Sequence, residues 1–138
     1  MTISGRPFQD FRDLVHSMPD AADEAVGSWK HPDNGAIVSF YACDQDLCAK
    51  ILKASEPGLK DSHNPDAGKR DQLLEGLVIL DHAKKTGDAD WSGNLYNTQD
   101  GKTYTGHVSL LSPSQLQLKG CALVVFCKSI VFTREAAQ

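Results

Sequence analysis

The 138-residue sequence lacks the features that define several large protein classes. No apolar run approaches the roughly 20 residues of a transmembrane helix, so no transmembrane segment is predicted. Lysine and arginine number 14 against 18 aspartates and glutamates, which leaves a net charge of -4. Binding to nucleic acid depends largely on clustered cationic side chains. Nucleic acid is therefore not an expected partner.

Catalytic motifs are also missing. The sequence has no Gly-x-Ser-x-Gly elbow, no Cys-x-x-Cys redox motif and no paired spacing of histidines. His107, alone on the polar face of a predicted strand, is expected to face solvent or to be hydrogen-bonded. The turns Asp33-Asn34-Gly35 and Asp100-Gly101 are too short for calcium loops. We predict that the protein is not an enzyme and has no catalytic residue, no cofactor and no metal site.

Residues 1–26 predict a helical extension rather than a secretory signal. Apolar residues at 8, 11, 14, 15 and 18 have helical spacing, and Pro19 ends the pattern. Charged residues interrupt this pattern, whereas a secretory signal needs a continuous apolar core. The location is thus uncertain, since either a signal was removed or the protein stays in the cytoplasm.

From residue 27 onward, the sequence changes to short strand-like segments separated by turns. Residues 36–43 and 103–111 are typical strands, and residues 32–35 form a strong hairpin turn. About eight segments can be counted, and residues 55–75 form the one long loop. Consecutive antiparallel strands with short turns favour an up-and-down barrel, with a two-sheet sandwich as the alternative. The predicted fold is all-β, with an N-terminal extension over 1–26 and a barrel domain over 27–138.

If the strands close into a ring, Trp29 on the first strand and Arg134 on the last become neighbours. Such a ring encloses an interior. Eight strands leave room for one small ligand. Candidate contacts are apolar residues at alternating strand positions, with Arg70 near the entrance, and a register error of one residue would exchange inside for outside. These candidates are Val38, Phe40, Ile51, Leu80, Tyr104, Val108, Leu116 and Arg70.

The long loop carries the second candidate surface. Asn64-Pro65-Asp66 is typical of an Asx turn, and Asp61, Asp66 and Arg70 have the charges for a cluster near the barrel mouth. The Arg70 guanidinium suits a carboxylate or phosphate bound by two parallel hydrogen bonds. In the simpler interpretation, the aspartates bond to loop amides and pair with Arg70.

The combined pattern resembles the bacterial family known as domain of unknown function 2147. The resemblance implies a lipocalin-like barrel, usually exported to the periplasm, with no established activity. Two positions depart from the family pattern, Ala49 for glycine and Phe132 for tryptophan, and neither threatens the fold. The matching residues are Gly27-Ser28-Trp29, Cys43, Leu47-Cys48, Asp61-x-x-Asn64-Pro65-Asp66, Arg70, Gly76, Trp91-Ser92-Gly93-Asn94-Leu95-Tyr96, Asp100-Gly101-Lys102-Thr103-Tyr104, Gly120-Cys121 and Thr133-Arg134.

The resemblance gives Trp29 and Arg134 an expected role. In lipocalins, a guanidinium lies on an indole at the closed end of the barrel. Such a cation–π contact is worth about 0.5 to 2 kcal/mol. We therefore expect this pair to close the barrel rather than to contact a ligand.

Four cysteines form two close pairs, Cys43 with Cys48 and Cys121 with Cys127. An even count in an exported protein predicts two disulfides, for which three connectivities exist, and we favour the local pairs. Free buried thiols and a four-thiolate zinc site stay open as alternatives. The spacings are looser than those of zinc knuckles, which disfavours the metal.

Two functional hypotheses follow. The first is a barrel that binds a small apolar or amphipathic ligand in its interior. The alternative is a structural or protein-interaction module of the bacterial cell envelope, without a ligand cavity, in which residues 55–75 contact another protein. An enzyme that uses cysteine or histidine chemistry is a third and weaker hypothesis.

Overall fold

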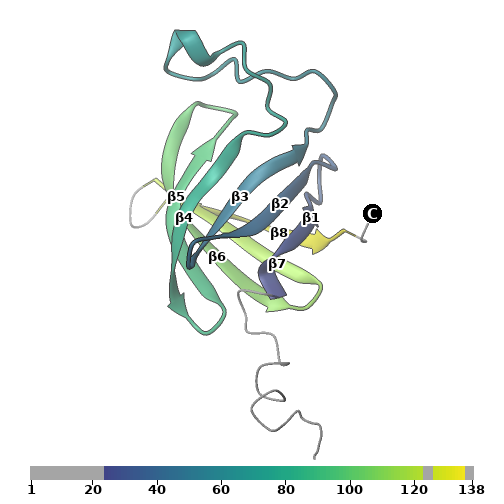
Figure 1. The fold of residues 1–138 in the computed structure, drawn as a ribbon, viewed down its shortest axis with the longest axis vertical. Helices are drawn as coiled ribbons and strands as arrows, with labels where there is room; N and C mark the ends of the chain where they lie inside the picture. Colours follow the sequence, from purple (N-terminus) through teal and green to yellow (C-terminus); the bar gives the residue numbers. More distant parts are fainter. Residues whose placement is uncertain (1–23, 123–125, 136–138) are drawn as a thin grey trace, which may run out of the picture.

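The chain folds into a closed barrel of eight antiparallel strands (Figure 1). The structure, a computed structural model, describes residues 24–122 and 126–135. The strands follow one another around the ring in chain order, so the up-and-down barrel is confirmed and the sandwich is excluded. Their bounds are β1 Gly27–Lys30, β2 Ile37–Cys43, β3 Asp46–Lys53, β4 Val78–Gly87, β5 Asp90–Asn97, β6 Lys102–Ser112, β7 Gln115–Cys121 and β8 Cys127–Arg134.

The predicted helix over residues 8–18 lies outside the described residues. Within them, Glu24 and Ala25 are helical directly before β1, and a 3-10 turn, η1 (Ala67–Lys69), lies in the long loop. No helix in the described part of the chain is long and apolar enough to cross a bilayer.

The up-and-down order divides the connections between two ends of the barrel. The β1–β2, β5–β6 and β7–β8 turns and the long β3–β4 loop lie at one end, which we call the loop end (Figure 1). The β2–β3, β4–β5 and β6–β7 turns lie at the other end, which we call the closure end. Side chains near the strand termini therefore belong to one end or the other.

Apolar side chains from every strand fill the barrel interior. Trp29 and Trp91 are 0% and 2% exposed, and strand pairing sets Trp91 opposite Val108. Full burial of one large apolar side chain contributes about 1.5 to 3 kcal/mol, so this cluster dominates the stability of the fold. Its members are Ala25, Trp29, Val38, Phe40, Leu47, Ala49, Leu80, Ala83, Trp91, Val108, Leu116 and Phe132.

Closure of the barrel joins Trp29 to Arg134, as predicted. The two residues are paired in the β1–β8 ladder, and the Arg134 guanidinium carbon lies 4.2 Å from the centre of the Trp29 ring. The Trp29 indole N–H donates to the Ala25 carbonyl oxygen at 2.8 Å. The indole is thus fixed on its face by a cation and on its edge by the residues that precede β1.

The Arg134 guanidinium also reaches three backbone carbonyls. Its Nε donates to the Pro113 oxygen at 2.7 Å, Nη1 donates to Val26 at 3.3 Å, and Nη2 donates to Glu24. A Cβ at Gly27 would lie 2.9 Å from Nη1, so a side chain at this position would displace the guanidinium. The Gly-x-Trp motif and the terminal arginine therefore act as one closing unit.

Candidate functional site

The residues predicted to contact an interior ligand lie in different environments. Ile51, opposite Val38 on the neighbouring strand, is 8% exposed. Tyr104 lies towards the loop end, where its hydroxyl donates to the Asp100 carboxylate. Arg70 is exposed on the long loop. The other five belong to the packed core: Val38, Phe40, Leu80, Val108 and Leu116.

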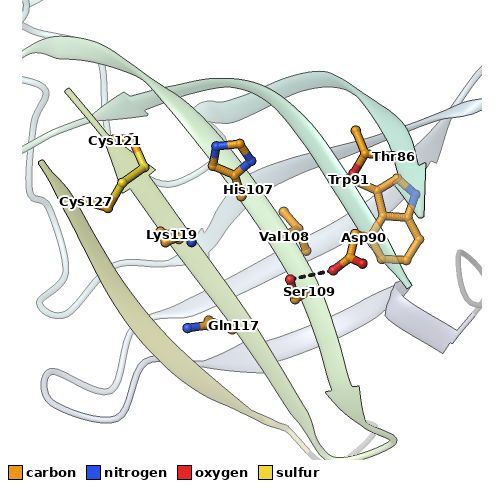
Figure 2. Close-up of a pocket in the computed structure, with 10 residues that line it drawn as sticks. All are labelled: Thr86, Asp90, Trp91, His107, Val108, Ser109, Gln117, Lys119, Cys121 and Cys127. Atoms are coloured by element: carbon orange, nitrogen blue, oxygen red, sulfur yellow. Dashed lines mark hydrogen bonds between the residues drawn. A yellow bond between two sulfur atoms is a disulfide. The ribbon is translucent and has the colours of Figure 1, made fainter. Parts of the chain in front are cut away.

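Two cavities of ligand size lie on the outside of the barrel. One, of about 300 Å³, lies beside β1 and the end of β3. The other, of about 360 Å³, is a groove on the outer face of β5, β6 and β7 (Figure 2). Ligand pockets usually start at about 300 Å³, so both are large enough for a small molecule.

The outer groove is mainly polar. His107 and Lys119 are paired across β6 and β7, and the Ser109 hydroxyl donates to Asp90 at 2.7 Å (Figure 2). The Cys121–Cys127 disulfide is part of the lining. His107 is thus on the outer wall, as the alternation of the strand predicts, and not inside the barrel.

The long loop is organised around the buried carboxylate of Asp61, which is 0% exposed. Its oxygens accept hydrogen bonds from Asn64 Nδ2 at 2.8 Å, Gln72 Nε2 at 3.2 Å and the Tyr96 hydroxyl at 2.8 Å. Burial alone would raise the pKa of Asp61, but these hydrogen bonds outweigh burial and hold the pKa below its ordinary value. Burial and the Asp61 carboxylate together raise the pKa of Tyr96 to about 12.

The remaining loop residues also make structural contacts. The Asn64 side-chain oxygen accepts from the Asp66 N–H at 2.8 Å, which is the predicted Asx turn. Arg70 Nε donates to the Asn64 carbonyl oxygen at 2.7 Å. In the described part of the chain, no ion pair joins Arg70 to Asp61 or Asp66. The motif therefore shapes the loop, while the predicted charged cluster does not form.

The β5–β6 hairpin supports the loop directly. Gly101 has a φ of 72°, and a Cβ at this position would lie only 1.8 Å from the His63 carbonyl oxygen. Pro65 packs beside the same position. Together with the Tyr96 bond to Asp61, this contact holds the loop against the barrel, so the Asp100-Gly101 turn does more than reverse the chain.

Both cysteine pairs are disulfides, with the favoured local connectivity. Cys43 is bonded to Cys48 across the β2–β3 hairpin, and Cys121 is bonded to Cys127 across the β7–β8 turn. No free cysteine is found among the described residues. The alternatives of free thiols and a four-thiolate site are thus excluded in this state.

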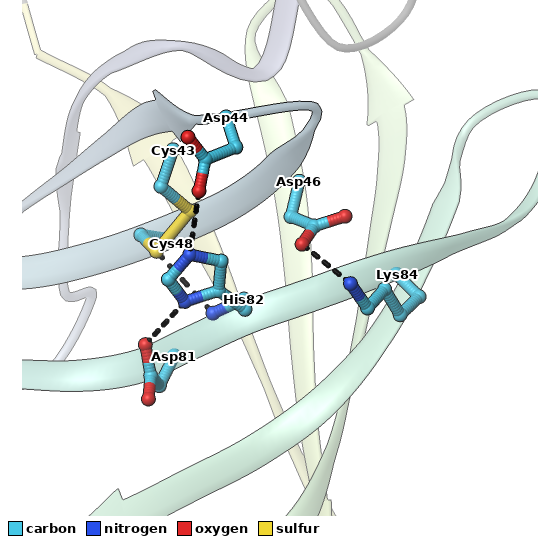
Figure 3. Close-up of a disulfide and its surroundings, with 7 residues drawn as sticks. All are labelled: Cys43, Asp44, Asp46, Cys48, Asp81, His82 and Lys84. Carbon is cyan, nitrogen blue, oxygen red and sulfur yellow. Dashed lines mark hydrogen bonds and ion pairs between the residues drawn. A yellow bond between two sulfur atoms is a disulfide. The ribbon is translucent and has the colours of Figure 1, made fainter.

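A cluster that the sequence did not predict surrounds the first disulfide (Figure 3). His82 on β4 lies beside it, with its backbone N–H 3.3 Å from the Cys48 sulfur. The His82 ring contacts Asp81 through Nδ1 at 2.7 Å and Asp44 through Nε2 at 3.3 Å. Hydrogen bonds to the Asp81 carboxylate and then to the Asp44 carboxylate raise the pKa of His82. Asp44 and His82 are 38 positions apart, so no local motif indicates that they meet.

The fold and its closing unit define a lipocalin-like β-barrel. A family model described as "uncharacterized protein conserved in bacteria", domain of unknown function 2147, matches residues 27–134. The chain belongs to this family, which confirms the resemblance.

A solved structure has the same architecture. It is protein HP1028 from Helicobacter pylori, described as belonging to the lipocalin family, with a TM-score of 0.73 and 22% sequence identity. The match covers 81% of this chain and 83% of that chain. At this identity the likeness shows the fold alone. No curated protein matches the chain.

Proposed function

We propose that the protein is a non-catalytic interaction module that contacts another protein through the loop end of its barrel. The observation that carries the proposal is the distribution of exposed apolar side chains. Five of the seven large hydrophobic residues that are exposed in the described chain lie at this end. They are Leu52, Leu59, Leu73, Val78 and Phe126.

Large exposed apolar patches are typical of contact sites, and the concentration of these side chains at one end of the barrel supports such a site there. Leu73 is 51% exposed and Leu52 is 50% exposed. The arms of the loop are joined by the Lys60–Leu73 bridge and by the hydrogen bond from Leu74 N to the Leu59 oxygen at 2.9 Å. These side chains are therefore presented by an organised segment, which lowers the entropy cost of binding.

The packed interior supports an external contact over an internal ligand. Five of the predicted ligand contacts are core residues, and the two cavities described above lie outside the barrel. An interior ligand would have to displace close-packed side chains, each of which contributes to stability.

The proposal is tested by site-specific photocrosslinking in the host organism. A photoreactive residue at Leu73 should link to one distinct protein. The matched control is Leu111, which is also 51% exposed but lies at the closure end. Replacement of Leu52 and Val78 by serine should reduce the Leu73 crosslink. Equal crosslinking from positions 73 and 111, or none from 73, would contradict the proposal.

A small interior ligand is the second candidate, and one observation favours it. Leu95, Leu118 and Ile130 pack against the core but are only partly buried. Pairing sets Leu118 opposite Ile130, on the same side of the sheet as the core residues Leu116 and Phe132. Native mass spectrometry of protein from its own host decides this case. A stoichiometric apolar molecule, lost on Leu118→Asp, would establish a ligand site at the loop end.

A further inference from the structure

We propose that reduction of the Cys43–Cys48 disulfide creates a site for zinc or a similar divalent cation, formed by Cys43, Cys48 and His82. One ligand atom from each of these residues lies within 4.8 Å of the other two. Among the described residues, this is the only group of three or more metal-binding side chains so close together.

The distances suit tetrahedral zinc. Zinc–sulfur bonds of about 2.3 Å and zinc–nitrogen bonds of about 2.0 Å place neighbouring ligand atoms about 3.5 to 3.8 Å apart. Once the S–S bond is broken, the two sulfurs need only move apart within the hairpin to reach this separation. Two thiolates and an imidazole are ligands that zinc prefers.

His82 is already oriented as a metal ligand. Asp81 holds Nδ1 at 2.7 Å, which leaves Nε2 on the other side of the ring (Figure 3). Zinc-bound histidines usually donate their second ring nitrogen to a carboxylate in this way. Asp44 Oδ2 lies 3.3 Å from Nε2, so this contact has to open when Nε2 binds the cation.

The backbone is distorted at the same place. In the described chain, the only non-glycine residues with positive φ are Asp44, at 57°, and His82, at 47°. The β4–β5 register shifts between Asp81 and Lys84, which indicates a bulge around His82. Bulges redirect side chains, and unfavourable φ values persist where a structure requires them. Both distorted residues contact each other beside the disulfide.

The redox step needs an external two-electron reductant, such as a dithiol. One reductant thiolate attacks the half-buried Cys43 sulfur, and Cys48 leaves as a thiolate beside the His82 N–H. The second reductant thiolate then attacks the reductant sulfur of the mixed disulfide, and Cys43 leaves as a thiolate. The reductant becomes a cyclic disulfide, and the protein gains two electrons and two protons. Binding of the cation displaces the two thiol protons.

The test is titration of the phosphine-reduced full chain with Co²⁺ under anaerobic conditions. The expected result is one tetrahedral Co²⁺ per chain, with thiolate charge-transfer bands that vanish on addition of Zn²⁺. His82→Ala should weaken Co²⁺ binding at least about tenfold. His107→Ala is the matched control, because His107 lines the groove beside the other disulfide, and it should bind Co²⁺ like the unaltered protein.

The design separates the outcomes. The Cys43→Ser/Cys48→Ser variant should lose the charge-transfer bands, while Cys121→Ser/Cys127→Ser should keep them. Circular dichroism shows whether each reduced form is folded. A reduced protein without tetrahedral Co²⁺ would overturn the proposal. Equal affinity of the His82→Ala variant for Co²⁺ would also overturn the proposal. This outcome includes the case in which reduction unfolds the barrel and the thiols bind Co²⁺ without His82.

Discussion

The Tyr96 hydroxyl donates a 2.8 Å hydrogen bond to Asp61, and this bond joins β5 to the β3–β4 loop. The acceptor is a fully buried carboxylate that also bonds Asn64 and Gln72. A buried charge is tolerated only when its hydrogen-bonding capacity is used. The loop conformation and the ionised state of Asp61 therefore depend on each other.

Removal of the Tyr96 hydroxyl should destabilise the protein measurably. Tyr96→Phe leaves one oxygen of the buried Asp61 carboxylate without this donor, and a hydrogen bond to a charged group contributes about 1.5 to 3 kcal/mol. Urea denaturation should show a loss of this size in the free energy of unfolding. Tyr41→Phe is the control, because the Tyr41 ring contacts Lys50 and its hydroxyl has no hydrogen bond among the described residues. Similar losses in both variants would refute the role of the Tyr96 bond.

The same carboxylate should make the protein sensitive to acid. Because the pKa of Asp61 is lowered in the folded state, its ionised form contributes stability above the ordinary pKa of 3.8. This contribution is lost as the pH falls through the folded-state pKa. Urea unfolding between about pH 5 and pH 2 should therefore show a steeper loss of stability in the unaltered protein than in Asp61→Asn. Parallel curves would show that Asp61 is not linked to unfolding.

Much of the fold could be predicted from the sequence because its determinants are local or lie on the first and last strands. Turn residues mark the hairpins, alternation marks strands such as 103–111, and the Gly-x-Trp motif with Arg134 indicates closure. Cys43 and Cys48 flank a single hairpin, so their pairing follows from strand register. These features need no knowledge of side-chain volumes.

The interior and the His82 cluster could not be predicted in the same way. Alternation indicates which side chains face inward, but whether they fill the barrel depends on summed volumes such as those of Trp29 and Trp91. His82 reaches the disulfide only because β4 is irregular at that point. A regular strand would shift the direction of the side chain, so the contact with Asp44 depends on tertiary structure.

Closure by Arg134 should require the guanidinium and not only its charge. Arg134→Lys keeps a cation but replaces three nitrogen donors, which bond Pro113, Val26 and Glu24, with one. We expect a loss of about 1.5 to 3 kcal/mol in the free energy of unfolding, measured by urea denaturation. Arg70→Lys is the matched control, since Arg70 makes one side-chain bond, to Asn64, and should lose less. If Arg134→Lys leaves the free energy of unfolding unchanged, strand pairing alone closes the barrel.

The contact between Gly101 and the loop should be measurable apart from backbone strain. Gly101 and Gly58 both have positive φ, 72° and 80°, so alanine at either position costs about 1 kcal/mol in conformational energy. Only at position 101 does the added Cβ meet the His63 carbonyl oxygen, whereas nothing lies within 4 Å at Gly58. Gly101→Ala should therefore lose clearly more free energy of unfolding than Gly58→Ala, and amide exchange in residues 61–72 should accelerate in the first variant alone. If both variants lose the same stability and exchange alike, the hairpin does not support the loop.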